Sequence, residues 1–126
     1  MTLLGLGGVP ASHRLNLGMM GMHGEAWVNQ AIQEADLLLA FGMRFDDRVT
    51  GRISAFAPNA KFIHVDIDAS EVDKNIKATV GMVGDLKAVL GQLLPKVEAN
   101  VHIDWLQHIN ELKAQHPSHL VRESDE

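Results

Sequence analysis

The apolar residues of the chain fall into short runs that alternate with stretches of helical spacing. Such runs occupy residues 2–7 (TLLGLG), 35–42 (ADLLLAFG), 59–68 (NAKFIHVDID) and 78–85 (ATVGMVGD). Each run is brief and ends near a glycine or an aspartate, which is typical of strands that are buried in a sheet. We therefore predict strands at these four places.

The intervening stretches carry helical periodicity. The spacing predicts an amphipathic helix over 24–34, a brief helix capped by Ser70, a helix over 85–97 capped by Asp85, and a terminal helix that ends before Pro117. Residues 8–23 are interrupted by glycine and proline, so we expect a loop there. The apolar stripe of the third helix is Leu86, Val89, Leu90, Leu93 and Leu94, and that of the last is Ile103, Leu106, Ile109 and Leu112.

Strands that alternate with helices predict an α/β fold with a mostly parallel sheet. In such sheets ligands bind at the carboxyl ends of the strands. The chain places glycine or aspartate at three of these ends, in the segments 42–47, 66–68 and 84–85. Glycine lets a backbone approach a ligand closely and carboxylates accept ribose hydroxyls, so these ends are expected to form one nucleotide-binding rim.

Composition narrows the function classes. The chain has 126 residues, 46% of them hydrophobic and 21% charged, which suits one globular domain. A net charge of -5 without a basic stripe argues against nucleic acid as a partner, and the absence of cysteine excludes disulfides and thiolate metal sites. No apolar run reaches the roughly 18 residues that a membrane span needs, and the start lacks a signal-peptide pattern, so we expect a cytoplasmic protein.

The segment GMRFDDRVTG follows the clearest strand. Arg44 could be a solvated residue of a plain turn, or its guanidinium could clamp a phosphate. Asp66 follows Gly42 at about the spacing, roughly 20 residues, at which nucleotide-binding folds place a ribose-binding acid. No GxGxxG fingerprint occurs, so an ordinary NAD site is poorly supported.

Two further patterns leave alternatives open. In HVDID the residues His64, Asp66 and Asp68 could share one strand face as a metal site, but a capping or solvated role is favoured. The methionines of GMMGMHG, residues 18–24, could form an apolar wall for a flat ligand or could simply anchor a mobile loop in the core. The sequence contains no serine elbow, Cys/His pair or paired carboxylates in an apolar setting, so the residues alone indicate nucleotide binding without complete catalytic machinery.

The stretches LGMMGMHGEAWVNQAIQEADLLLAFGMRFDDRVTG and AKFIHVDIDASEVDKN closely resemble one family. They are similar to the central domain of the large, catalytic subunit of acetohydroxyacid synthases, also called acetolactate synthases, from Thr2 to about residue 117. The resemblance implies a Rossmann-like domain that binds FAD. It also implies an enzyme that condenses two 2-oxoacids with decarboxylation, using thiamine diphosphate and Mg, in branched-chain amino-acid biosynthesis.

The resemblance also implies site residues, matched by motif. Met22, Asp47 and Arg48 match positions that line the access channel to thiamine diphosphate, and Arg48 matches an arginine implicated in choosing the second 2-oxoacid. No catalytic residue and no metal ligand is implied within this chain. The implied FAD contacts are Thr2, Leu3, Met20, Gly21, Met22, His23, Gly42, Met43, Arg44, Phe45, Asp46, Asp66, Ile67, Asp85 and Leu86.

Parts of the family pattern have no counterpart here. Nothing resembles the glutamate that activates the thiazolium or the diphosphate and magnesium motif, and the family's first strand and helix would precede Thr2. We therefore expect a truncated central domain over 1–117, a polar, disordered tail over 118–126, and self-association through a bare strand edge. We also expect contact with the remaining domains of the parent enzyme, weak or absent FAD binding, and no carboligation by the chain alone.

Two other functions compete with the enzyme fragment. One is a stand-alone nucleotide-binding or interaction module that keeps the fold without the reaction. The other is a metal-dependent transferase that uses the DID segment, which the residues disfavour.

Overall fold

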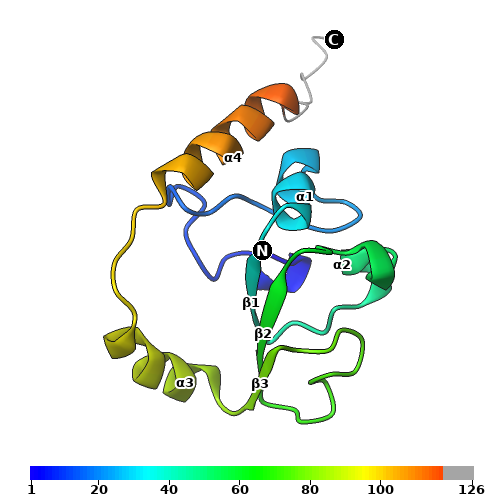
Figure 1. Ribbon diagram of the computed structural model, residues 1–126, viewed down its shortest axis with the longest axis vertical. Helices are drawn as coiled ribbons and strands as arrows, with labels where there is room; N and C mark the ends of the chain where they lie inside the picture. The colour runs from blue at the N-terminus through cyan, green and yellow to red at the C-terminus, as the bar shows by residue number, and fades with distance from the viewer. Residues whose placement is uncertain (118–126) are drawn as a thin grey trace, which may run out of the picture.

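The computed structural model describes residues 1–117, and in this range it forms a three-stranded sheet with helices on both sides (Figure 1). The strands lie in the order β1-β2-β3, and each runs parallel to its neighbour. The predicted α/β class with a parallel sheet is therefore confirmed. The elements are η1 (Leu3–Gly5), α1 (Ala26–Gln33), β1 (Leu37–Phe41), α2 (Asp47–Thr50), η2 (Ile53–Ala55), β2 (Lys61–Asp66), β3 (Val80–Val83), α3 (Leu86–Leu93), η3 (Leu94–Lys96) and α4 (Ile103–Gln115).

Three of the four predicted strands are present, but the strand predicted over 2–7 is wrong. This segment forms the 3₁₀ turn η1, in which Leu3 and Leu4 are exposed. Its backbone hydrogen bonds are local, from the Gly5 N–H to the Thr2 carbonyl and from the Gly8 N–H to the Gly5 carbonyl. Closely spaced glycines favour such turns over an extended strand.

The predicted helices over 24–34, 85–97 and before Pro117 correspond to α1, α3 with η3, and α4. The brief helix predicted after Ser70 is wrong, because residues 67–78 form turns and irregular backbone. Local carboxylates take the backbone N–H groups there. Asp68 Oδ1 accepts from the Ser70 N–H at 2.9 Å and Asp73 Oδ1 accepts from the Ala78 N–H at 2.7 Å, which competes with helix formation.

One face of the sheet is buried by an aromatic cluster. In Figure 1 the sheet is seen nearly edge-on, with α2 on one side of it and α3 on the other. The Phe45 ring meets the Phe56 and Phe62 rings edge-on, with centroids 6.2 and 5.8 Å apart. Such contacts add to the hydrophobic gain from burying the rings. The buried members of the cluster are Ala40, Phe45, Phe56, Ala57 and Phe62.

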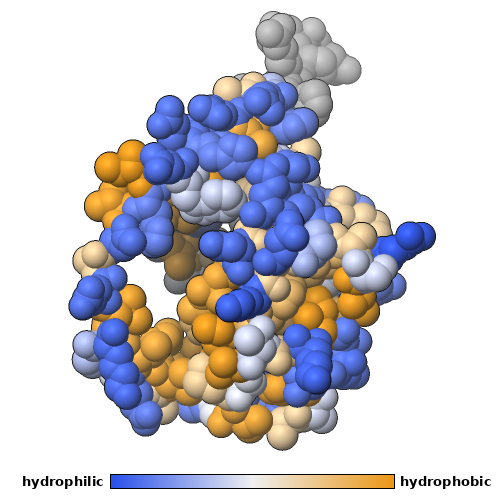
Figure 2. Space-filling model, in the orientation of Figure 1, coloured by the Kyte–Doolittle hydropathy of each residue, from blue (hydrophilic) through white to orange (hydrophobic). Residues whose placement is uncertain are grey.

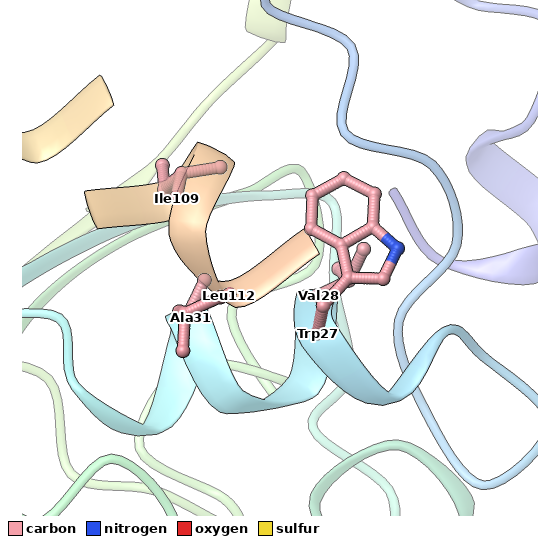
Figure 3. Close-up of a cluster of buried hydrophobic side chains, with 5 residues drawn as sticks. All are labelled: Trp27, Val28, Ala31, Ile109 and Leu112. Carbon is pink, nitrogen blue, oxygen red and sulfur yellow. The ribbon is translucent and has the colours of Figure 1, made fainter. Parts of the chain in front are cut away.

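A second cluster joins α1 to α4, two helices far apart in the sequence. Trp27, Val28 and Ala31 of α1 pack against the α4 residues Ile109 and Leu112 (Figure 3). All five side chains are at most 5% exposed. This pairing fixes the terminal helix to the body of the domain.

The opposite face of the sheet is uncovered along β1. Leu37, Leu39 and Phe41 alternate along β1 and are 46%, 44% and 38% exposed. The predicted stripe of α3 is also exposed, with Leu90 at 39% and Leu94 at 76%. Figure 2 shows apolar surface around a hollow between the sheet and the linker that joins α3 to α4. The helix was predicted correctly, but its apolar stripe is not buried within the described residues.

Two further expectations concern the C-terminal tail and the absence of a membrane span. The tail predicted over 118–126 lies outside the described residues. Within residues 1–117, no helix combines the length and the apolar character needed to cross a membrane.

Candidate nucleotide site

The three predicted strand ends lie side by side. The Gly42 N–H, just after β1, donates to the Val65 carbonyl of β2 at 2.8 Å. The Gly84 N–H, just after β3, donates to the Asp66 carbonyl at 2.9 Å. Residues 42–46, 66–68 and 84–86 therefore form one continuous edge, which we call the strand-end rim.

The backbone at Gly42, just after the end of β1, leaves free space at the strand-end rim. Its φ of 64° lies in the left-handed region, so the turn itself favours glycine. A Cβ added at this position would meet no atom within 4 Å, so the space above the Gly42 backbone is free for a ligand.

Arg44 is available at the surface of the rim. Its side chain is 63% exposed, and its guanidinium lies 3.6 Å from the Asp46 carboxylate. An exposed pair of this kind is weak, so the guanidinium can turn toward an anion at little cost. The Arg44 backbone is held in place because the Asn75 amide donates to its carbonyl at 2.9 Å.

Phe45 differs from its neighbours in the predicted contact set. Its backbone is left-handed, with φ of 53°, and its side chain is 3% exposed in the aromatic cluster. The ring therefore anchors the loop beneath the rim, and a contact from Phe45 to a ligand would come from its backbone.

Asp66 and His64 share the buried face of β2. They are 8% and 1% exposed, so neither is solvated. The capping or solvated role favoured from the sequence is therefore wrong for His64, whose ring has no hydrogen bond among the described residues, whereas Asp66 does have a capping role. Asp66 Oδ1 accepts the Asp68 N–H at 2.9 Å, which fixes the turn that leaves the strand. His64 Nε2 lies 3.8 Å from Asp66 Oδ2.

Asp68 lies beyond the end of β2 and does have the predicted capping role. It accepts from both the hydroxyl and the backbone N–H of Ser70, and these bonds lower the pKa of its carboxyl. Among residues 1–117, no three His, Cys, Asp or Glu side chains are grouped closely enough to hold a metal ion.

The third strand end leads into α3. Asp85 caps this helix as predicted, because its carboxylate accepts the Ala88 N–H at 3.0 Å. The Asp85 side chain therefore already has a hydrogen-bond partner within α3. The preceding N–H groups of the first turn have no partner within the helix, and the helix dipole makes this end attractive to phosphate. Ile67 and Leu86 flank the rim with exposures of 73% and 38%.

The three predicted channel residues are also brought together. Met22, Asp47 and Arg48 line one cavity of about 260 Å³ between α2 and residues 18–24, which we call the methionine loop. The Met22 N–H donates to the Arg48 carbonyl at 2.9 Å. Asn29 holds the loop from the other side, since its amide accepts the Gly21 N–H and donates to the Gly21 carbonyl, both at 2.8 Å.

The remaining predicted contacts lie in the methionine loop and the N-terminal segment. Met20 is partly buried and packs against both hydrophobic clusters, whereas Met22 is 71% exposed. Each of the two alternatives for this loop thus applies to a different residue. Met20 anchors the loop in the core, and Met22 forms exposed apolar surface. Met43 is partly buried against the aromatic cluster, and His23 is exposed. Thr2 and Leu3 have no hydrogen bond to the strand-end rim among the described residues.

The sequence patterns did not predict that three residues support the site. Asn29 and Asn75 clamp backbone that is distant along the chain, and no local pattern signals such a bond. His64 sits inside HVDID, where the alternation with Asp66 indicated a shared face but not its burial.

A larger cavity of about 570 Å³ lies elsewhere. It is bounded by α1, β1 and α4 and is lined mainly by apolar side chains such as Leu17, Val28 and Leu37. It contains no carboxylate or arginine, in contrast to the strand-end rim with Arg44 and Asp66.

A parallel sheet with a glycine turn, a carboxylate and a helix N-terminus at adjacent strand ends is an arrangement common in α/β domains that bind nucleotides. The sequence profile described as "Thiamine pyrophosphate enzyme, central domain" matches residues 1–93. The chain belongs to this family of thiamine pyrophosphate enzyme central domains, as the sequence resemblance predicted.

The similar curated proteins carry a more particular name. The chain is 46% identical over 125 residues to "Acetolactate synthase isozyme 1 large subunit" of Escherichia coli (strain K12), covering 99% of this chain and 22% of that protein. It is 51% identical over 115 residues to "Probable acetolactate synthase large subunit" of Methanocaldococcus jannaschii, covering 89% and 20%. It is 45% identical over 122 residues to "Acetolactate synthase 1, chloroplastic" of Nicotiana tabacum, covering 92% and 18%. The chain thus spans about a fifth of the length of these relatives.

Proposed function

We propose that the chain is the FAD-binding central domain of an acetolactate synthase large subunit. The observation that carries this proposal is the strand-end rim, where Gly42, Asp66 and the start of α3 meet at hydrogen-bonded strand ends. The support from sequence is the identity of 45–51% to proteins with that name.

The residues of the rim fit the parts of a flavin nucleotide. Asp66 would accept the ribose hydroxyls, while Arg44 and the first-turn N–H groups of α3 would bind the diphosphate. The open space above Gly42 admits the nucleotide backbone without a clash. In this domain family FAD would stabilise the architecture and would take no net redox part in the carboligation.

The cavity between the methionine loop and α2 is proposed to face the substrates. Met22, Asp47 and Arg48 would form one wall of the channel that leads to thiamine diphosphate and Mg, which the remaining domains of the parent enzyme would hold. The Arg48 guanidinium would select the second 2-oxoacid, because two of its parallel N–H groups match the two oxygens of a carboxylate. The pathway served would be branched-chain amino-acid biosynthesis, with the enzyme acting in the cytoplasm.

A stand-alone nucleotide-binding module is the second candidate. It is supported by the strand-end rim, whose three hydrogen-bonded strand ends all belong to this chain. Both candidates bind FAD, and in neither does this chain alone join two 2-oxoacids. They differ in whether the chain contacts thiamine-binding domains.

Titration of FAD into the purified chain tests the proposed site, with flavin fluorescence and thermal melting as readouts. We expect weak but saturable binding, which is weakened further in Asp66→Asn and retained in Asp104→Asn, an acid-to-amide change on the exposed first turn of α4. No response at high FAD would overturn the flavin site. Acetolactate formed from pyruvate, thiamine diphosphate and Mg by this chain alone would overturn the expectation that it is catalytically incomplete.

A further inference from the structure

His64 is a buried imidazole without a hydrogen bond. The residue is 1% exposed, and neither Nδ1 nor Nε2 has a hydrogen-bond partner among the described residues. Burying a polar group without a partner is costly, so such groups are rare in folded proteins and call for an explanation.

The surroundings of the ring offer one charged neighbour. The Phe45 ring meets the imidazole edge-on, with centroids 5.1 Å apart and planes at 84°. Phe62 lies two residues earlier on the same face of β2 and is also buried. These aromatic groups shield the imidazole from water. Nε2 faces the Asp66 carboxylate, with Oδ2 at 3.8 Å.

Asp66 is fixed on one side and loose on the other. Its Oδ1 accepts the Asp68 N–H at 2.9 Å, and its backbone carbonyl accepts the Gly84 N–H at 2.9 Å. Among the described residues no hydrogen bond holds Oδ2. The His64 imidazole lies within ion-pair distance of it. The present gap exceeds a normal N–H···O bond by about 1 Å, which a small side-chain rotation closes.

We propose that His64 is a positioning residue for Asp66, the carboxylate assigned above to the ribose. The Nε2–H would donate to Oδ2 while the Asp68 N–H donates to Oδ1, so that the inner lone pairs of both oxygens are occupied. Each carboxylate oxygen keeps a second lone pair that these two bonds leave free. The two free lone pairs then face the rim at the spacing of two neighbouring ribose hydroxyls. This inference rests on the proposed flavin site, and it extends that site to a residue inside the core.

Substitution of His64 separates positioning from simple packing. His64→Met fills the volume without a donor, and His64→Gln keeps an amide donor. We expect FAD to bind about ten-fold more weakly to His64→Met, the effect of losing one hydrogen bond to a charged group, and to retain most of its affinity for His64→Gln. The melting temperature of His64→Met should change little, because methionine keeps the buried volume and the cost of burying the imidazole, which offsets its hydrogen bond to Asp66, is removed with it.

Phe62→Leu is the matched control on the same face of β2. It should lower the melting temperature while leaving the FAD affinity of the folded chain within about two-fold, because it removes packing and no polar contact. Wild-type affinity in His64→Met would overturn the inference, and so would weakened binding that tracks a lower melting temperature in every variant.

A ligand-free measurement keeps this inference separate from the proposed function. Imidazole ¹⁵N correlation spectra of the chain without FAD report which ring nitrogen of His64 carries the proton. We expect a proton on Nε2 whose signal moves in Asp66→Asn. If the wild-type chain fails to bind FAD, the flavin proposal fails, and this signal decides the positioning role by itself. A proton confined to Nδ1, or an Nε2 signal that does not respond to Asp66→Asn, would overturn it.

Discussion

At the scale of single residues, Gly24 illustrates how closely the methionine loop packs onto the start of α1. A Cβ added to Gly24 would lie 2.4 Å from the Met19 carbonyl oxygen and 2.6 Å from the Met20 carbonyl carbon. Both are backbone atoms, so the loop itself would have to shift. The Glu25 N–H also donates to the Met19 carbonyl at 3.0 Å, which ties the loop to the helix at the same point.

We therefore expect Gly24→Ala to destabilise the chain by about 2 kcal/mol or more, as steric clashes with fixed backbone commonly do. Gly91→Ala is the matched control. Gly91 lies within α3 and an added Cβ meets no atom within 4 Å, so this change should stabilise by about 0.5–1 kcal/mol. Urea unfolding of both variants measures the difference. Equal stabilities for the two variants would contradict the packing described for Gly24.

Residue roles could be predicted where they depend on position along a strand. Gly42, Asp66 and Asp85 lie at or just beyond the ends of strands, so their meeting at one edge follows from a parallel sheet. The inward turn of Phe45 could not be predicted, because its neighbours are all polar and its left-handed backbone is a property of the folded loop. The burial of His64 likewise depends on Phe45, which reaches it from another element.

At the scale of elements, the pairing of α1 with α4 depends on a few buried side chains. Leu112 is 5% exposed in this interface, whereas Ile103 at the start of the same helix is 68% exposed. We expect Leu112→Ala to cost about 2–4 kcal/mol and Ile103→Ala less than about 1 kcal/mol. Denaturant unfolding gives both values. A similar cost at the two positions would show that α4 is not held by this face.

The same pair of helices is joined by a polar contact that responds to pH. Glu34 follows α1 and its carboxylate contacts the His108 imidazole of α4. Hydrogen bonds from Gln30 first, and then from His108, lower the pKa of Glu34 below its usual 4.5. A carboxyl whose pKa is depressed by folding stabilises the fold above its usual pKa, and this contribution is lost as the pH falls through the depressed value.

The melting temperature of the wild-type chain should therefore exceed that of Glu34→Gln above pH 4.5, and the difference should shrink as the pH falls below it. Melting curves of both proteins across this range measure the effect. Asp104→Asn, an exposed acid-to-amide change at the other end of α4, serves as the control. A difference between wild type and Glu34→Gln that is independent of pH would contradict the assignment.

Element types were predictable where periodicity is strong, as in 24–34, 35–42 and the terminal helix. The strand predicted over 2–7 failed because its apolar letters are separated by glycines that favour turns, and no neighbouring strand pairs with it among the described residues. The helix predicted after Ser70 failed because aspartates at 68 and 73 bind nearby N–H groups instead. In both cases local hydrogen bonding outweighed the pattern.

At the scale of the whole molecule, the sheet has an open edge beside an open apolar face. β1 pairs with β2 on one side, and no strand within residues 1–117 pairs with its other side. The sequence LLLAF of β1 contains no charge or proline that would discourage pairing. We propose that two copies of the chain associate by antiparallel pairing of their β1 edges.

Sedimentation velocity over a wide concentration range tests this association. Leu39→Lys places a charge on the exposed face of β1 and should shift the chain toward monomer. Leu94→Lys introduces the same charge at a more exposed apolar position on η3 and should leave the association unchanged. A monomeric wild-type chain, or an equal effect of the two variants, would contradict association through β1.

Long-range arrangement is the part of the molecule that sequence patterns predicted least. The contact of α1 with α4 and the Asn75 bond to Arg44 join segments that are distant in the chain, and neither leaves a local signal. The open apolar faces were likewise not visible in the periodicity of α3, which reads as an ordinary buried stripe.

The binding of a flavin nucleotide at the strand-end rim is tested most directly by amide chemical-shift mapping of the ¹⁵N-labelled chain during FAD titration. We predict shifts concentrated in residues 42–46, 66–68 and 84–86, with small changes in the α1–α4 interface. The same titration of Asp66→Asn should show smaller shifts at equal FAD. An unchanged spectrum at high FAD, or shifts centred on the apolar cavity near Val28 and Leu37, would contradict a flavin site at the rim.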